Sequence, residues 1–373
     1  MKKSKIITLN KSLLNSYWND DFNEFCRLIE NGANIDYIDE HGISLIANIT
    51  ENRNNIKDNK LFFDKLIDMD VSLKTPPYGI DLLSISIMSR NNKIYYTEKL
   101  LQKGLNVNYK SLSRLNGPMT GYDDSSKFGP CIFIAVEFFD KEKIELLLKY
   151  KVDLKICNEK NDPIVNHLFK KCLLDKELCE KILPILIKKG AMADEFGGCG
   201  RQPIHLWALY SESKKAFNCL VKNNVDINAR DMLGETALMK SAKRPNFKSA
   251  MILIENKAEL DKTDAFGKTA AMFAAEDVNF AILEILMEAG CNVLLTDKNK
   301  ENIMHFLMKA LKANKHYLDT ETLIDIYKKH PKLFYAKNNK KETPLDFLKK
   351  ANKKQYKYFI NHINKTEKEF IID

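Results

Sequence analysis

Polar turns and short apolar runs alternate along this chain, and in its second half they repeat every 33 residues. The segments DMLGETALMKSA, DAFGKTAAMFAA and DKNKENIMHFLM open at Asp231, Asp264 and Asp297, respectively. In each period a polar turn precedes a run of small and apolar residues, and a second apolar run follows before the next turn. Runs of this length separated by turn residues predict two short helices in every period.

The residues at the turns support this interpretation. Gly234 and Gly267 follow the opening aspartates by three positions, where glycine permits the positive φ of a tight turn. Thr236 and Thr269 come next and can cap the first helix by accepting a backbone N–H. Gly290 stands where the second helix should end, a position that favours glycine. The sequence therefore predicts a turn, a helix, a turn and a second helix in each unit.

This period and the segments quoted above resemble the ankyrin-repeat family, whose units of 33 residues open on a turn and a T-P-L-H-x-A-like helix start. GRQPIHLWAL at residues 200–209 and ETPLDFL at residues 342–348 carry the same motif. The resemblance implies an all-α ankyrin-repeat solenoid of helix-turn-helix units joined by short hairpin turns. The chain is similar to the irregular ankyrin proteins of intracellular bacteria and large DNA viruses.

About ten such units can be followed through the whole chain from the position where each second helix should end. These positions are Gly32, Asp70, Gly104, Lys151, Gly190, Asn224, Lys257, Gly290, His330 and Ile363. We therefore expect one solenoid over residues 1–373, with an N-terminal cap repeat at 1–38, central repeats at 39–337 and a basic C-terminal cap at 338–373. Residues 111–127, rich in Gly, Pro and Ser, predict a loop insertion.

Composition limits the cellular setting. The chain is 45% hydrophobic and 29% charged, as in folded proteins, and no apolar run approaches the ~18 residues of a membrane span. The N-terminal apolar stretch is shorter than that of a secretory signal. We expect a cytoplasmic protein, or one secreted into a host cell cytosol without a classical signal peptide.

The net charge of +9 belongs to the C-terminal end. Residues 298–373 contain eighteen lysines, no arginine and nine acidic residues, so the rest of the chain is neutral overall. Lys350, Lys354 and Lys357 follow at helical spacing, with Tyr356 and Tyr358 on either side of Lys357. A solvated terminal cap and a site for an anionic partner both agree with this pattern.

No catalytic, cofactor or metal site is predicted. His205 and His305 occupy the histidine position of the family motif, where the resemblance implies that the ring braces a loop. The eight cysteines include no C-x-x-C pair, so they are expected to be free thiols rather than metal ligands. No nucleophile, phosphate-binding or metalloprotease signature is present.

The resemblance implies that partner proteins bind at the hairpin tips and on the inward (concave) face of the first helices. Large apolar residues at such positions can anchor an interface. The predicted partner-binding residues are Tyr78, Met88, Phe138, Leu209, Tyr210, Met232, Leu233, Arg244 and Phe266.

The sequence thus favours a non-enzymatic module, monomeric on its own, that binds a partner protein. Its Lys, Asn and Ile usage is typical of an AT-rich genome and raises the hypothesis of a secreted effector that acts on host proteins. The alternative is binding of nucleic acid or an anionic membrane through the basic C-terminal end.

Overall fold

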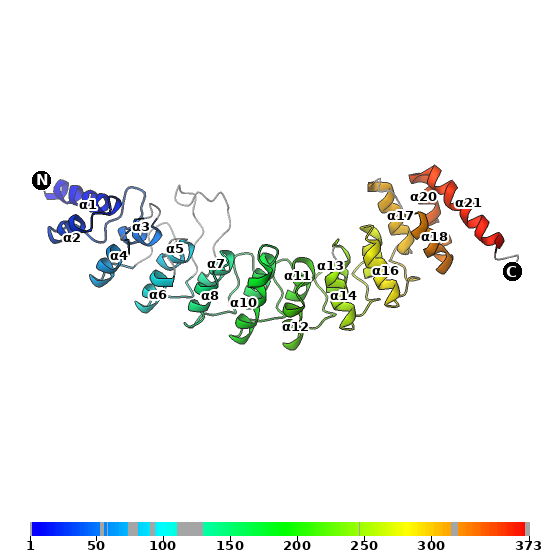
Figure 1. Ribbon diagram of the computed structural model, residues 1–373, viewed down its shortest axis with the longest axis horizontal. Helices are drawn as coiled ribbons and strands as arrows, with labels where there is room; N and C mark the ends of the chain where they lie inside the picture. Colours follow the sequence, from blue (N-terminus) through cyan, green and yellow to red (C-terminus); the bar gives the residue numbers. More distant parts are fainter. Residues whose placement is uncertain are drawn as a thin grey trace. The chain divides into compact units, whose positions relative to one another are not determined.

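The computed structural model describes most of the chain (Figure 1). The described ranges are 2–52, 56–57, 59–73, 81–89, 94–109, 130–245, 247–314 and 320–369. Within them the regular elements are all helices, and Ile38 and Ser44 form an isolated antiparallel bridge. The predicted all-α fold is confirmed. Tyr78 and the insertion at 111–127 lie outside the described ranges.

The chain forms two compact units. The first comprises Met1–Lys171 and Glu177–Met192, and the second comprises Cys172–Lys176 and Ala193–Asp373. The prediction of one continuous solenoid over residues 1–373 stays a prediction.

The described residues of the first unit form five successive helix pairs. They are α1 (Lys2–Trp18) and α2 (Phe22–Glu30), α3 (Leu45–Glu51) and α4 (Asn59–Asp68), α5 (Leu82–Met88) and α6 (Ile94–Gln102), α7 (Cys131–Glu137) and α8 (Lys141–Leu147), and α9 (Ile164–Lys171) and α10 (Lys176–Lys188). From the second pair onward, the first helices pack in order, α3 on α5, α5 on α7 and α7 on α9. Each pair therefore buries its apolar faces against its neighbours.

Aromatic side chains dominate the core near the start of this unit. The Tyr17 ring meets the Phe62 ring edge to face at 5.3 Å. Its hydroxyl donates to Asn59 Oδ1 at 2.8 Å, and Asn59 Nδ2 in turn donates to the Tyr96 hydroxyl oxygen at 2.9 Å. These buried polar atoms join three helices by hydrogen bonds, as buried polar groups generally require.

The second unit contains the regular repeats (Figure 1). Its helices are α11 (Pro203–Tyr210), α12 (Lys214–Lys222), α13 (Ala237–Ala242), α14 (Lys248–Glu255), α15 (Ala270–Glu276), α16 (Phe280–Glu288), α17 (Ile303–Asn314), α18 (Thr320–Lys329), α19 (Lys332–Tyr335), α20 (Pro344–Ala351) and α21 (Lys353–Glu369). The first helices α11, α13, α15, α17 and α20 pack each on the next. Small side chains such as Ala242, Ala274 and Ala275, all buried, permit this close approach.

The opening aspartate of each regular unit closes its turn. Asp264 Oδ1 accepts from the backbone N–H groups of Phe266 and Lys268, both at 2.8 Å. Asp231 and Asp297 do the same in their units. Gly234 and Gly267 have φ of +74° and +87°, which confirms the expected tight turn.

The threonine caps are also present. Thr269 Oγ1 accepts from the Met272 N–H at 3.4 Å, and Thr343 Oγ1 accepts from the Asp346 N–H at 3.3 Å. Each bond satisfies one of the N–H groups that the first turn of a helix leaves unpaired.

Seven of the ten positions at which a second helix is expected to end have positive φ, Gly190 and Gly290 among them. The exit expected at Ile363 is wrong, because α21 runs without a break from Lys353 to Glu369. No glycine stands in this segment. Ile363 instead lies on the buried side of α21.

The expectation of eight free thiols is also wrong. Cys172 and Cys179, both buried, are disulfide-bonded, whereas the other six cysteines are free. Only residues 172–175 separate α9 from α10, so the chain itself keeps these two positions close. Spacing in the sequence could not reveal the bond, since it depends on where the two helices end.

Candidate protein-binding surface

The hairpin tips of the second unit form a continuous row. Met232 N–H donates to the Gly200 carbonyl oxygen at 3.1 Å, and Ala265 N–H donates to that of Leu233 at 3.0 Å. The row continues from Lys298 N–H to the Phe266 carbonyl oxygen at 3.0 Å. One backbone hydrogen bond therefore fixes each tip to the one before it.

Three predicted partner-binding residues lie exposed on this row. Met232 is 80% exposed, Leu233 49% and Phe266 60%. A Cβ atom at Gly200 would come within 2.2 Å of Met232 Sδ, so only glycine lets the Met232 side chain lie across the neighbouring tip. Large apolar groups left in water on a rigid backbone are typical of interaction surfaces. We call Met232, Leu233 and Phe266 the apolar tips.

The other predicted residues of this unit lie at the opposite ends of the first helices. Leu209 and Tyr210 are the last residues of α11, and Arg244 follows α13 by two positions; all three are half-buried. The Arg244 carbonyl oxygen accepts from Asn279 Nδ2 at 2.5 Å. The structure does not bring these three residues next to the apolar tips. The tips precede each first helix, whereas these residues lie at its C-terminal end, so the length of the helix separates them.

In the first unit, Met88 ends α5 and Phe138 follows α7, and both are half-buried. Tyr78 lies outside the described ranges.

The two motif histidines hold neighbouring hairpins together. His205 Nε2 lies 3.0 Å from the Ala229 carbonyl oxygen and 3.1 Å from that of Glu235, so it donates to the next hairpin. His305 Nε2 likewise donates to the Glu342 carbonyl oxygen at 3.2 Å. Burial lowers the pKa of both imidazoles, which favours the neutral form that this bonding needs. The rings therefore brace loops.

A buried charge cluster stands behind the apolar tips. Lys240, 2% exposed, bridges to Asp231 Oδ2 at 2.6 Å and also to Glu235. Lys243 reaches the second oxygen of Glu235 at 2.7 Å. Burial alone would raise the pKa of the Glu235 carboxyl, but the hydrogen bonds from both lysines outweigh burial and hold that pKa below its usual range. Both acids are therefore ionised at neutral pH.

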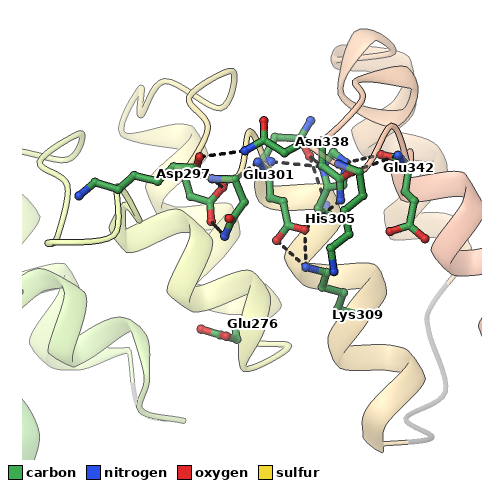
Figure 2. A network of polar contacts seen from close by, with 12 residues as sticks. Glu276, Asp297, Glu301, His305, Lys309, Asn338 and Glu342 are labelled. Carbon is green, nitrogen blue, oxygen red and sulfur yellow. Dashed lines mark hydrogen bonds and ion pairs between the residues drawn. The ribbon is translucent and has the colours of Figure 1, made fainter.

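The Lys243–Glu235 bridge recurs in the following units with the same spacing of eight residues. Lys268 bridges to Glu276 at 2.8 Å, Lys309 bridges to Glu301, and Lys350 bridges to Glu342 at 2.6 Å. Figure 2 shows the unit around Glu301, where Asn338 Nδ2 of the next unit also donates to that carboxylate at 3.0 Å. Each first helix is thus clamped to its own hairpin.

The same lysines lie over phenylalanine rings, which belong to the next unit for Lys243, Lys268 and Lys309 and to the same helix for Lys350. Lys243 Nζ lies 4.0 Å from the Phe273 ring centre, and Lys268 Nζ lies 4.6 Å from that of Phe306. Lys309 and Lys350 lie 5.4 and 5.8 Å from the Phe347 ring centre. Cation–π contacts at these distances are attractive. The resulting lysine–phenylalanine stripe comprises Lys243, Phe273, Lys268, Phe306, Lys309, Phe347 and Lys350.

Sequence reasoning missed this stripe, although a signal for it exists. In four consecutive units, the fourth and twelfth residues after the opening position carry opposite charges. The fourth residue is acidic and the twelfth is basic, except that Lys268 and Glu276 have the reverse order. This recurring pair of opposite charges could have revealed the bridges.

Within the described ranges, no group of three or more His, Cys, Asp or Glu side chains is placed to hold a metal ion. None of the helices described there is long and apolar enough to cross a membrane.

One of the comparisons with known proteins agrees with this geometry. A search of the curated proteins found no match. Residues 204–297 match the family "Ankyrin repeats (3 copies)", and this stretch includes α11 to α16, the apolar tips and the turns closed by Asp231 and Asp264. Ankyrin repeats generally mediate protein–protein interaction. The chain therefore contains ankyrin repeats, which the family match places at residues 204–297.

Proposed function

We propose that this protein binds a partner protein through the apolar tips, Met232, Leu233 and Phe266, and catalyses no reaction. The observation that carries the proposal is their exposure on consecutive hairpins whose backbones are hydrogen-bonded to one another. A rigid row of anchors loses little conformational entropy on binding, so most of the apolar contact contributes to affinity.

The buried groups behind the tips support a binding role over a catalytic one. Lys240 and Lys243 together neutralise Asp231 and Glu235, and His205 is engaged with backbone carbonyl oxygens. Catalysis needs an acid, base or nucleophile that can reach a substrate. These groups are committed to holding the hairpins in place.

Half-buried Leu209, Tyr210 and Arg244 would form a second contact region at the far ends of the first helices, and Met88 and Phe138 occupy similar ends in the first unit. Residues at the edge of an interface generally contribute less than central anchors. Their substitution should therefore weaken binding less than substitution of the apolar tips.

A photo-crosslinking amino acid at position 266 tests the proposal directly. We expect it to capture a discrete protein from cells that contain the partner, whereas the same group at Leu174, which is 77% exposed away from the tips, should not. Equal labelling from both positions would contradict the proposal.

Affinity for the captured protein then provides the quantitative test. Replacing Met232, Leu233 and Phe266 together by aspartate should weaken binding about 30-fold or more, since a true anchor contributes about 2 kcal/mol or more. Leu174→Asp serves as the matched control and should leave affinity unchanged. Thermal stability should stay the same in both, because exposed substitutions alter unfolding by about 0.5 kcal/mol at most. Unchanged affinity in the triple variant would place the partner elsewhere.

A further inference from the structure

We propose that the exposed face of α21 binds single-stranded nucleic acid without sequence preference, with lysines contacting phosphates and Tyr358 stacking on a base. This site is separate from the apolar tips and does not depend on the function proposed for them.

The first observation is positive charge without an ion partner in the described part of the chain. Lys353, Lys354 and Lys357 are exposed on α21, and none of them meets a carboxylate among the residues that the structure describes. Lys349, at the end of α20, lies 5.7 Å from the Tyr356 ring centre and extends the same basic region. Like charges held this close repel one another, so an anion that binds among them is stabilised.

The second observation is that three nearby carboxylates, those of Asp325, Glu342 and Asp346, already have partners. Helix α21 packs on α18 and α20. Asp325 of α18 lies 4.0 Å from Lys328, and Asp346 of α20 accepts from Thr343 N–H and Oγ1, both at 2.8 Å. Glu342 bridges to Lys350. These described acids therefore leave the positive field of α21 open to an external anion.

The third observation distinguishes nucleic acid from a membrane. A helix that lies in a membrane surface buries its apolar face among the lipids. The apolar face of α21 is instead covered by protein, since Phe359 stacks on Phe334 at 5.3 Å and Ile363 is 3% exposed. Only its basic face is available, and that face is suited to phosphates rather than to acyl chains.

Tyr358 favours single strands over duplexes. Its ring is 58% exposed beside Lys357, and it stacks near-parallel on His362 with 6.3 Å between ring centres. An exposed aromatic ring among lysines provides a platform for an unpaired base, and stacking is tolerant of sequence because every base has a flat face. Paired bases are already stacked within a duplex and gain nothing from it.

Anisotropy titrations of the full-length chain with a short labelled oligouridylate test the site. With three phosphate contacts, affinity should fall about 15-fold between about 50 and 200 mM salt. Replacing Lys353, Lys354 and Lys357 together by glutamine should remove most of this salt dependence. Tyr358→Leu should weaken binding about fivefold or more and leave the salt dependence unchanged.

The matched control replaces three exposed lysines elsewhere, Lys188, Lys189 and Lys222, by glutamine. It changes the net charge equally and should leave affinity unchanged, with circular dichroism confirming that all variants are folded. An equal loss in this control would overturn the proposal, as would a duplex of the same sequence length bound as tightly as the single strand. Binding to phosphatidylserine vesicles without binding to the oligonucleotide would assign the face to membranes and refute it as well.

Discussion

The lysines of the lysine–phenylalanine stripe and those of α21 differ in what surrounds them, although both belong to the second unit. Lys243, Lys268 and Lys309 each have a carboxylate of their own unit and an aromatic ring of a neighbouring unit. Lys353, Lys354 and Lys357 have no carboxylate among the residues that the structure describes. Lysine thus stabilises the packing of the repeats in the stripe and remains available for binding on α21. Net charge alone could not distinguish these two roles.

The largest effect should come from the most buried lysine behind the stripe. Lys240→Met would leave Asp231 and Glu235 buried without their shared cation. Breaking one partner of a buried ion cluster costs about 3–5 kcal/mol, and urea unfolding followed by circular dichroism would measure this loss. Lys354→Met is the control and should have almost no effect. A loss below about 1 kcal/mol for Lys240→Met would show that the cluster contributes little.

Acid should produce the next effect, through the bridged carboxylates and the two buried motif histidines. Burial alone would raise the pKa of Glu137, yet hydrogen bonds from His167 and Lys171 outweigh it and lower the pKa to about 2. Glu235 is also lowered, and burial lowers the pKa of His205 and His305.

For each of these groups the unfolded chain binds a proton more readily than the folded chain, so stability falls as the pH falls. The histidine contribution should be lost below about pH 6.5 and the carboxylate contribution below about pH 4.5. Urea midpoints measured from neutral pH down to about pH 3 should decline in these two stages. A midpoint independent of pH across this range would mean that the bridges are not formed.

The smallest effect should appear on α21. Lys354→Gln with Lys357→Gln should change the unfolding free energy by less than about 0.5 kcal/mol, because exposed lysines without ion partners hold nothing together. Glu342→Gln, which breaks an exposed bridge to Lys350, should lower the unfolding free energy slightly more. Differential scanning calorimetry can resolve the two. The reverse order would contradict the distinction between the two sets of lysines.

Much of the fold could be predicted because each repeat encodes its own turns. The side chain of Asp264, the positive φ of Gly267 and the cap at Thr269 act within a few residues of one another. Exposure of Met232 and Phe266 followed from the same register. These local interactions depend little on the remainder of the chain.

What escaped prediction depends on distant contacts. The lysine–phenylalanine stripe joins residues about one repeat apart, as Lys243 and Phe273 illustrate, and only packing of α13 on α15 brings them together. The wrong exit at Ile363 has the same origin, since the polar segment around it is held as a helix by Phe334 packing on Phe359. Periodicity indicates where a unit begins, but not which side chains its neighbours supply.

The eight-residue bridge has a consequence for how such a gene can change. In the second unit, both charges of each bridge are encoded within one repeat, as with Glu301 and Lys309. A recombination event that duplicates or removes a whole repeat therefore adds or deletes a cation together with its anion. The array can lengthen or shorten without separating the two charges of such a bridge, so each added first helix brings its own ion pair to its hairpin.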